Sequence, residues 1–450
     1  MAQPIPTSRI LRRLLASGAQ GRAANLLGRI HPADVGPLLG DLGPDEIRTV
    51  VELLFRQQRA ENLLRELPFE LLGDVMEALG DARLAEVLGR LEVDDVAELV
   101  DALPETRREA ILERLPQQRQ RELKRLELYP ASSAGRVMTT SYVALDETMT
   151  SAEAVESIRA SGDLADSILY LYVVDENHCL RGVVPIRRLV ASPSDRTCRE
   201  LMLPEPVRVT PEVDQEEVAR IVARYDLLAV PVTDVDGTLL GVITVDDVID
   251  VITEEATEDM YHLAGLSEED RVFSPPRLAI RKRLPWMVLN LATVILAASV
   301  VALFEHTLEQ MVSLALFLPV VGGMAGNGGI QALTVTTRGI ALGEIEFSTG
   351  IRAVTKETIV GLSLGAATGL ICALLAFAWS GNPYLGFVLF LSLVVTLTFA
   401  GLFGAAVPLA LKAIGQDPAL GAGVIVTTFT DAFGFLTFLG SATLLLDRLH

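Results

Sequence analysis

The chain of 450 residues is long enough for two to four domains, and its composition is split into an acidic part and an apolar part. Residues 1–276 hold 29 basic and 50 acidic residues, a net charge of −21, whereas residues 277–450 hold 9 and 8. This acidity argues against nucleic acid and favours cations as partners. The three cysteines share no spacing typical of a disulfide framework or a zinc site.

Residues 1–128 predict a succession of short amphipathic helices. Leu, Ile and Val recur at helical spacing, and prolines stand at four expected helix starts: Pro32, Pro44, Pro104 and Pro116. Because each unit is too short to bury its own apolar stripe, we expect an all-α superhelical domain of stacked units. Asp94, Asp95 and Glu98 are candidate cation ligands, although the helix dipole also favours acids in a first turn.

An internal repeat with an offset of 59 residues follows. Tyr172–Asp175 and then Gly182–Val184 resemble Pro231–Asp234 and then Gly241–Ile243. Each copy combines an amphipathic helix, two short β-rich runs and a closing helix. The pattern is similar to a tandem CBS pair, an α+β module, with its first domain at residues 129–199 and its second at 200–252.

The CBS resemblance implies a nucleotide site in the second copy. In that family a Thr and an Asp after the glycine-containing strand hold a nucleotide ribose, and Thr244 and Asp247 occupy those places. The first copy has Pro185 and Arg188 instead, so at most one ligand such as ATP is implied per chain. A CBS pair used only as a dimerising scaffold stays open as the alternative.

Residues 253–276 are expected to form an acidic connecting helix into the apolar part. Seven acids and no base stand between Asp246 and Asp259, and like charges four residues apart destabilise a helix. A divalent cation would compensate, because Mg²⁺ and Ca²⁺ take carboxylate oxygens, whereas a solvated acidic face is the alternative. The candidate regulatory ligands here are Asp246, Asp247, Asp250, Glu254, Glu255, Glu258 and Asp259.

Residues 277–450 predict five membrane-spanning helices. Five apolar runs, 284–304, 312–336, 358–378, 385–411 and 419–446, can each cross about 30 Å of hydrocarbon. Lys and Arg lie before the first run, between the second and third, and between the fourth and fifth, whereas the opposite connections have none. The positive-inside rule therefore predicts a multi-pass protein of the plasma (inner) membrane with its N-terminus in the cytoplasm and its C-terminus outside.

Two of these runs carry polar features that lipid disfavours. Pro319 and five glycines in the second run predict irregular backbone whose carbonyls line a cavity, with close helix packing through small residues as the alternative. Asn327, Gln331, Thr334 and Thr336 add neutral oxygens. Asp431 is the one charged residue between Ala419 and Leu446, where a carboxylate costs roughly 2.5–3.5 kcal/mol against lipid. Such an acid predicts an ion pathway, with a hydrogen bond to a neighbouring helix as the alternative. No P-loop or HExxH motif is present, so we expect no enzyme.

Together these residues resemble the MgtE family of magnesium channels and transporters over almost the whole chain. The matching residues are Leu91–Pro104, Tyr129-Pro130, Ala134–Thr139, Thr253–Asp259, Leu263–Gly265, Gly326-Asn327 with Gln331, Arg338-Gly339, Gly343-Glu344, and Asp417–Ala419 with Thr427-Thr428 and Asp431. The chain departs from the family at Ala422-Gly423-Val424, where members often carry Ser-Gly-Pro or Ser-Asn-Pro.

The resemblance implies a homodimer that encloses one pore, in which paired Asp431 residues hold hydrated Mg²⁺. It assigns six further residues to the pore: Gly323, Gly326, Asn327, Gln331, Thr427 and Thr428. It also implies a magnesium-selective uptake channel, closed when cytosolic Mg²⁺ bridges carboxylates of the helical domain, the CBS pair and the connector, which acts as a plug helix. A secondary transporter exchanging Mg²⁺ or Co²⁺ for Na⁺ or H⁺, and a membrane-anchored CBS sensor, are the alternatives.

Overall fold

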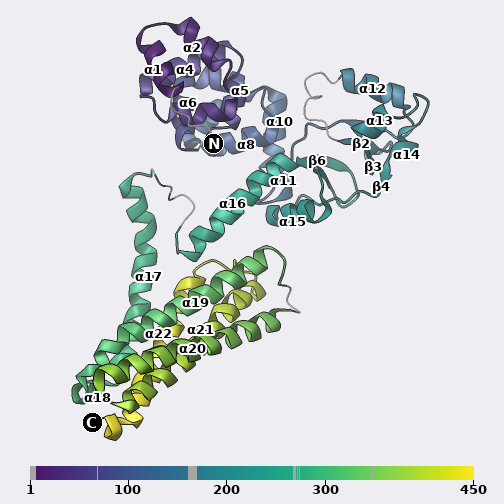
Figure 1. Ribbon diagram of the computed structural model, residues 1–450. Helices are drawn as coiled ribbons and strands as arrows, with labels where there is room; N and C mark the ends of the chain where they lie inside the picture. Colours follow the sequence, from purple (N-terminus) through teal and green to yellow (C-terminus); the bar gives the residue numbers. More distant parts are fainter. Residues whose placement is uncertain are drawn as a thin grey trace. The chain divides into compact units, whose positions relative to one another are not determined.

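The computed structural model describes residues 7–67, 69–160, 170–266, 270, 272, 274–345 and 349–449 (Figure 1). Its contacts divide the chain into two compact units, Met1–Ile252 and Thr253–His450.

The first unit opens with short helices, as predicted. They are α1 (Thr7–Ala16), α2 (Gln20–Leu27), the 3-10 helix η1 (Pro32–Asp34), α3 (Val35–Leu39), α4 (Pro44–Arg56), α5 (Ala60–Arg65), α6 (Phe69–Leu79), α7 (Asp81–Leu88), α8 (Val93–Asp101), α9 (Glu105–Leu112) and α10 (Gln117–Leu126). Pro44 is the first residue of α4, and Pro104 and Pro116 directly precede α9 and α10. Their buried Leu and Val side chains form one continuous core, which confirms that the short helices stack.

The repeat folds as an α+β pair, which confirms the predicted class. Its elements are α11 (Ala134–Val137), β1 (Ala144–Asp146), α12 (Ser151–Ala160), β2 (Tyr170–Val174), β3 (Leu180–Pro185), α13 (Ile186–Val190), α14 (Cys198–Leu201), β4 (Leu203–Pro204), α15 (Gln215–Tyr225), β5 (Ala229–Thr233) and β6 (Leu239–Thr244). One sheet has the order β1-β2-β3-β4, and β5 pairs with β6. The antiparallel pairs β2–β3 and β5–β6 both shift register, after Val173 and Val232 respectively, so even this irregularity repeats with the sequence.

The acidic run lies on α16 (Val245–Leu263), which begins directly after β6. The residues from 253 onward, predicted as a separate connecting helix over 253–276, are thus the second half of a longer helix that ends at Leu263. No Pro or Gly interrupts the chain at residue 252, so the closing helix of the repeat continues without a break. It ends where Gly265 takes a φ of +69° and the Leu266 amide donates to the Tyr261 carbonyl at 2.8 Å, the bond of a glycine helix cap.

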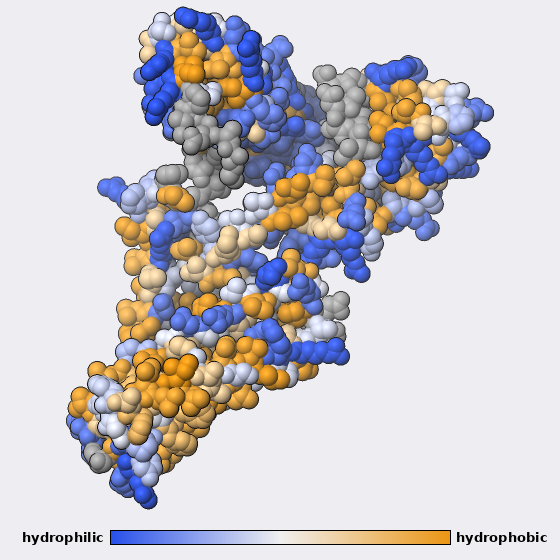
Figure 2. Space-filling model, viewed as in Figure 1, coloured by the Kyte–Doolittle hydropathy of each residue, from blue (hydrophilic) through white to orange (hydrophobic). Residues whose placement is uncertain are grey.

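Within the described residues, five helices are long and apolar enough to cross a membrane, as predicted. They are α17 (Pro276–Ala302), the segment of η3 (Val312–Phe317) and α19 (Leu318–Ala341), α20 (Gly350–Ser380), α21 (Pro383–Ala413) and α22 (Ala422–Leu444). Short helices α18 (Glu305–Gln310) and α23 (Leu446–Leu449) accompany them. Apolar side chains spread over much of the visible surface of this helix group (Figure 2), as lipid contact requires.

The membrane helices pack through glycines, which bring the backbones close together. A Cβ added at Gly361 of α20 would lie 2.2 Å from the Leu397 carbonyl oxygen of α21, and one added at Gly365 would lie 2.8 Å from the Leu393 oxygen. Across α19 and α21, a Cβ at Gly404 would lie 2.6 Å from the Gly329 oxygen. Any larger residue would collide at these contacts. Small residues that let backbones approach closely are a usual means by which helices associate in lipid.

The irregular backbone predicted for the second run is wrong, because α19 is a continuous helix from Leu318 to Ala341. Pro319 lies in its first turn, where the amide that proline lacks has no helical partner in any case. Two of the glycines allow neighbouring helices to pack closely and do not break the helix. A Cβ at Gly328 would lie 2.6 Å from Leu397 Cδ2, and one at Gly329 would lie 2.7 Å from Val426 Cγ1. The carbonyls of α19 are therefore engaged within the helix.

Candidate functional site

A polar stripe runs along one face of α19. Gly323, Asn327, Gln331 and Thr334 recur at intervals of three or four residues, and all four are exposed in the single chain. An added Cβ at Gly323 or at Gly326 would meet no atom within 4 Å. Within the described residues, the side-chain amides of Asn327 and Gln331 make no hydrogen bond. This face of an apolar helix is thus both polar and uncovered.

Asp431 lies on α22, which packs against α19. Its Oδ1 lies 3.9 Å from the place where a Cβ of Gly322 would stand, so the glycine leaves space beside the carboxylate. The two helices run antiparallel, since Gly322 faces Asp431 whereas Gly329 faces Val426. Among the described residues nothing forms a hydrogen bond or an ion pair with the Asp431 carboxylate, which argues against the alternative of an acid bonded to a neighbouring helix.

Stacked aromatic rings fix the rotation of α22 against α21. Phe433 stacks on Phe399 and Phe429 stacks on Phe403, each pair with ring centroids 5.0 Å apart. Phe429 and Phe433 stand two residues on either side of Asp431, so the stack determines which way the carboxylate points.

The predicted threonines of α22 bond their own helix. The Thr427 hydroxyl donates to the Gly423 carbonyl at 2.9 Å, and the Thr428 hydroxyl donates to the Val424 carbonyl at 2.6 Å. Both side chains are half-buried. A hydroxyl that donates keeps its acceptor lone pairs, so either oxygen can still accept from an ion's water shell.

In the first unit, acids of α8 and α16 form one cluster. Asp94 Oδ1 is buried and has no hydrogen-bond partner among the described residues. Burial, with Asp247, Asp95 and Glu92 nearby, raises the pKa of Asp94 well above its ordinary value. Burial also raises the pKa of Asp247 to about 6, with Asp246 and Asp95 adding to the shift.

Asp95 of this cluster has a cation partner. Its carboxylate accepts from the Arg65 guanidinium at 2.5 Å. Burial raises the pKa of Asp95, although Arg65 opposes the shift. Arg65 therefore neutralises only part of the cluster's charge, since it also lies 3.1 Å from Glu92.

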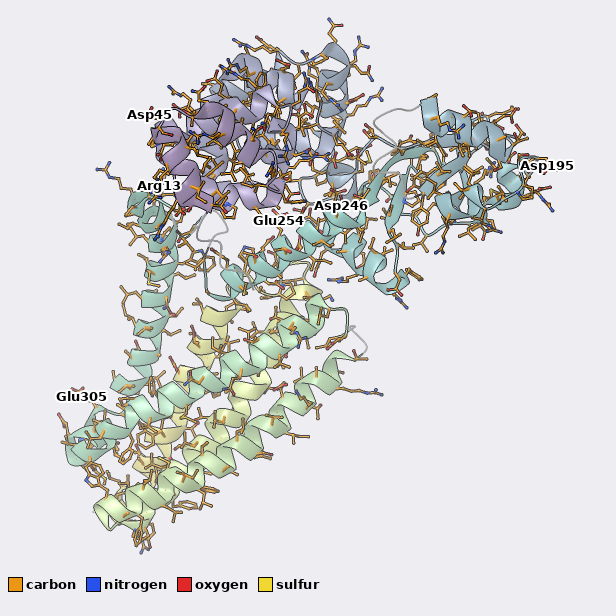
Figure 3. The ribbon with its side chains drawn as sticks, turned by 45° about the horizontal axis from the view of Figure 1, so that its top comes forward. Arg13, Asp45, Asp195, Asp246, Glu254 and Glu305 are labelled. Carbon is orange, nitrogen blue, oxygen red and sulfur yellow. The ribbon has the colours of Figure 1, made fainter. Side chains whose placement is uncertain are left out.

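The other predicted regulatory acids lie beside this cluster, on α8, or further along α16. Asp250 stands near Asp246 and Glu66, which together with burial raise its pKa, whereas Glu98 is exposed on α8. The remaining four belong to the second unit and lie about one to two and a half turns beyond Asp250 along α16: Glu254, Glu255, Glu258 and Asp259. Figure 3 shows Asp246 and Glu254 on this helix.

The two predicted nucleotide residues contact each other. The Thr244 hydroxyl donates to Asp247 Oδ2 at 2.5 Å, and the Thr244 amide donates to the same oxygen at 3.3 Å. Asp247 thus belongs both to the predicted ribose position and to the acid cluster.

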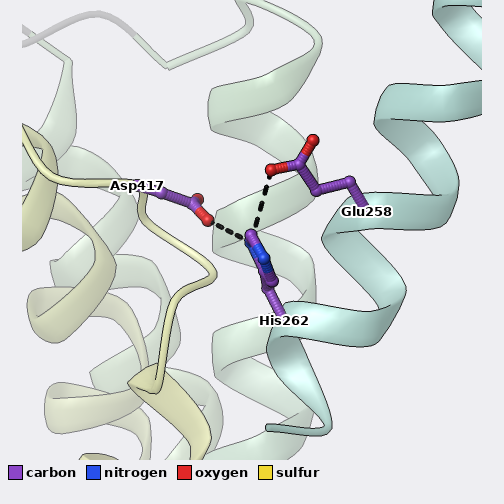
Figure 4. Close-up of side chains that lie close together, drawn as sticks. All are labelled: Glu258, His262 and Asp417. Atoms are coloured by element: carbon purple, nitrogen blue, oxygen red, sulfur yellow. Dashed lines mark hydrogen bonds and ion pairs between the residues drawn. The ribbon is translucent and has the colours of Figure 1, made fainter. Parts of the chain in front are cut away.

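A third group includes two residues that the sequence interpretation did not assign to a site. Nδ1 of His262 lies 2.6 Å from Asp417 Oδ2 and 3.7 Å from Glu258 Oε1 (Figure 4). The four-residue spacing of Glu258 and His262 is visible in the sequence, and it places both side chains on one helix face. Asp417 is 155 residues away from His262, and no pattern links the two.

The end of α16 docks at the start of α22. A Cβ added at Gly423 would lie 2.8 Å from the Leu263 carbonyl oxygen. Trp286 of α17 lies close by, 3.8 Å from a Cβ at Gly265 and 3.3 Å from one at Gly421. The acidic helix is therefore in direct contact with the helix that carries Asp431.

Family matches cover most of the chain in three parts. The "MgtE intracellular N domain" matches residues 30–132, the "CBS domain" matches 134–195 and 198–254, and the "Divalent cation transporter" family matches 318–441. Fold and matches together define a multi-span divalent-cation transporter with a CBS pair.

Individual relatives match the chain over nearly its full length. The magnesium transporter MgtE of Thermus thermophilus is 36% identical over 97% of this chain and 98% of its own, and that of Bacillus subtilis is 32% identical over 97% and 96%. A solved cytosolic domain of the Mg²⁺ channel MgtE in complex with ATP, 34% identical, covers 54% of this chain and 99% of its own, with a TM-score of 0.52. The chain belongs to the MgtE family of magnesium transporters.

Proposed function

We propose that the chain forms a homodimeric, magnesium-selective channel for Mg²⁺ uptake, and that cytosolic Mg²⁺ bound to its acids closes the channel. The uncovered polar stripe of α19 beside the unpartnered Asp431 of α22 carries the proposal. Lipid against this face would leave amides and a carboxylate unsatisfied, at a cost of several kcal/mol. A second copy with the same face opposed to it would enclose these groups around water and ions instead.

The pore chemistry suits a hydrated cation. Mg²⁺ gives up its water reluctantly and is usually held through one or two carboxylates, which paired Asp431 residues would supply. Because α19 is a regular helix, side-chain oxygens of Asn327, Gln331 and the threonines, not bare carbonyls, would contact the ion's water shell. The basic residues flanking the spans support a cytoplasmic N-terminus and an outside C-terminus in the plasma membrane.

Closure by Mg²⁺ follows from the acids that the structure gathers. Asp94 and Asp247 stand in a partly buried cluster whose charges repel each other, and a bound cation would relieve that repulsion. Further negative charges lie along α16 toward its end, which contacts α22; they belong to Glu254, Glu255, Glu258 and Asp259. A cation that binds the closed arrangement more tightly than the open one shifts the population toward closure.

Nucleotide at the second CBS domain would act on the same cluster. The solved relative contains ATP, and in this chain Thr244 and Asp247 stand where the CBS family holds a ribose. ATP bound there would take Asp247 away from the acids that hold Mg²⁺, so nucleotide and cation would influence each other's affinity reciprocally.

A secondary transporter exchanging Mg²⁺ or Co²⁺ for Na⁺ or H⁺ is the second candidate. Coupling normally uses further charged groups within the membrane. The buried acid Glu357 near the start of α20 is the other candidate for that role, but the Lys356 amine lies 2.5 Å from its carboxylate. This neutralised pair favours the channel over the exchanger.

Mg²⁺ uptake into proteoliposomes tests the pore assignment. Asp431→Asn removes the charge with little change in shape, and we expect uptake to fall by about 100-fold, as loss of a close ionic contact of about 3 kcal/mol would cause. Asp447→Asn, at an exposed position on α23, is the matched control and should transport normally. Normal uptake by Asp431→Asn would remove this residue from the pore.

A further inference from the structure

The first two helices carry positive charge in a soluble part that is otherwise acidic. Residues 1–33 hold five arginines and no Asp or Glu, whereas residues 1–276 together have a net charge of −21. All five arginines are exposed: Arg9, Arg12, Arg13, Arg22 and Arg29. The positive charge is thus concentrated on α1 and α2, which pack against each other, and directly after α2.

The packing of α1 determines which way its arginines point. Leu11 is fully buried in the core of the domain. Arg9, Arg12 and Arg13 lie on the opposite side of the helix, at spacings of three and four residues. Ile10, which is 45% exposed, lies at the border of this side. The buried side of α1 therefore holds the helix on its domain, and its arginine side faces outward.

These arginines lack the carboxylate partners that other arginines of the same domain have. Arg56, Arg90 and Arg119 each lie between 2.7 and 3.1 Å from a glutamate oxygen. Arg12 lies 3.6 Å from Glu46, and within the described residues the other four guanidinium groups of α1 and α2 form no ion pair or hydrogen bond. Their counter-charge is therefore to be sought outside the domain.

Anionic lipid headgroups fit this surface. The chain's own membrane helices hold the domain near a bilayer, so headgroups are present at high effective concentration. Arginine forms two parallel hydrogen bonds with a phosphate group, and the negative potential of an anionic bilayer attracts basic residues. We propose that the arginine side of α1, together with Arg22 of α2, docks on the bilayer surface and binds the phosphates of anionic lipids. This contact depends on membrane anchorage and not on ion conduction.

An acidic surface of a second copy would supply the same negative charge. It would leave the exposed Ile10 against polar groups, whereas the interfacial layer of a bilayer accepts an apolar side chain beside basic ones. The acid cluster of α8 also has an arginine of its own, because Arg65 lies 2.5 Å from Asp95. These two observations favour lipid as the partner.

Fluorescence quenching by headgroup-labelled lipid tests the contact in the full chain. In a chain whose Cys179, Cys198 and Cys372 are replaced by Ser, a fluorophore is attached at Ser17→Cys, an exposed position directly after α1. The vesicles contain phosphatidylcholine with a nitroxide on its headgroup, with or without phosphatidylglycerol. We expect strong quenching with phosphatidylglycerol that added NaCl reverses, because salt screens the attraction, and little quenching without it. Equal quenching in both kinds of vesicle would overturn the proposal.

Replacing Arg9, Arg13 and Arg22 together by Gln should reduce quenching to the level in phosphatidylcholine alone. Loss of three basic residues weakens attachment to an anionic surface by about 100-fold. Unchanged quenching in this triple variant would contradict the role given to α1.

The matched control removes three ion-paired arginines from the same domain: Arg56→Gln, Arg90→Gln and Arg119→Gln. It changes the net charge by the same amount and should quench as the wild type, whereas an equal loss in both triple variants would overturn the proposal. In detergent without lipid, acrylamide should reach the Ser17→Cys fluorophore freely. Protection that salt reverses there, together with no effect of phosphatidylglycerol, would identify an acidic protein surface as the partner instead.

Discussion

Asp94 and Asp247 hold protons in the folded chain more tightly than isolated carboxyl groups do. Their pKa values are raised chiefly by burial, to about 6 for Asp247; Asp247 adds to the shift of Asp94, and Asp95 adds to both shifts. A divalent cation that binds there, as proposed, would compete with those protons for the same oxygens. Through these two residues, the stability of the first unit would then depend on both pH and Mg²⁺.

Stability should fall with rising pH when Mg²⁺ is absent. Because the folded pKa of Asp247 lies above its unfolded value, the folded state binds more protons between about pH 4 and 6, and the free energy of unfolding declines across that window by at most about 3 kcal/mol. Above pH 6, added Mg²⁺ should restore stability. Thermal unfolding of the detergent-solubilised chain at pH 5 and pH 7, with and without Mg²⁺, measures both effects.

Asp247→Asn should lose most of this dependence on pH and Mg²⁺. Asp195→Asn, at an exposed position in the first CBS domain, is the control and should behave as the wild type. The same pH and Mg²⁺ response in wild type and Asp247→Asn would contradict the role given to this carboxylate.

Individual residues differed in how far the sequence predicted them. Asp431 stands out as a candidate from the sequence alone, because one charge in a long apolar run needs no structure to be noticed. The pairing of His262 with Asp417 was not, since the two residues meet only through the docking of α16 on α22. The burial of Asp94 Oδ1 likewise depends on α8 meeting α16, which no local pattern encodes.

At the scale of elements, α16 joins the acid cluster to the membrane helices. Neutralising its last turns with Glu255→Gln, Glu258→Gln and Asp259→Asn removes the charges that a cation would bridge. We expect flux to persist at internal Mg²⁺ concentrations that close the wild type, with a shift of about ten-fold or more in the inhibiting concentration. Glu212→Gln, a charge-neutralising change outside α16, serves as the control, and unchanged inhibition in the triple variant would remove the connector from the sensor.

The elements themselves were largely predictable, with two instructive exceptions. Apolar periodicity and proline positions predicted the short helices and the five spans. The local pattern of apolar residues is sufficient to show which side chains will face a protein core or the lipid. For α19, the glycines suggested an irregular backbone, yet they pack against Leu397, Val426 and Gly404 on neighbouring helices. The sequence of α19 alone does not show these packing contacts. The predicted connector is the second half of a longer helix, because a domain boundary need not interrupt a helix.

For the whole molecule, a homodimer with opposed α19 stripes predicts a specific cross-link. In a chain whose Cys179, Cys198 and Cys372 are replaced by Ser, Asn327→Cys should cross-link to a second copy with a short bifunctional thiol reagent, because the exposed stripe faces its counterpart. Leu374→Cys, 60% exposed on α20, should remain monomeric. Equal cross-linking at both positions would contradict the proposed dimer face.

Magnesium current through the reconstituted wild-type protein, recorded by patch clamp with Mg²⁺ as the one permeant cation and internal Mg²⁺ varied, tests the proposed function most directly. We predict a Mg²⁺ current that falls as internal Mg²⁺ rises and that Asp431→Asn reduces by about 100-fold. No current, together with flux-assay uptake that requires a Na⁺ or H⁺ gradient, would contradict the channel and favour coupled exchange.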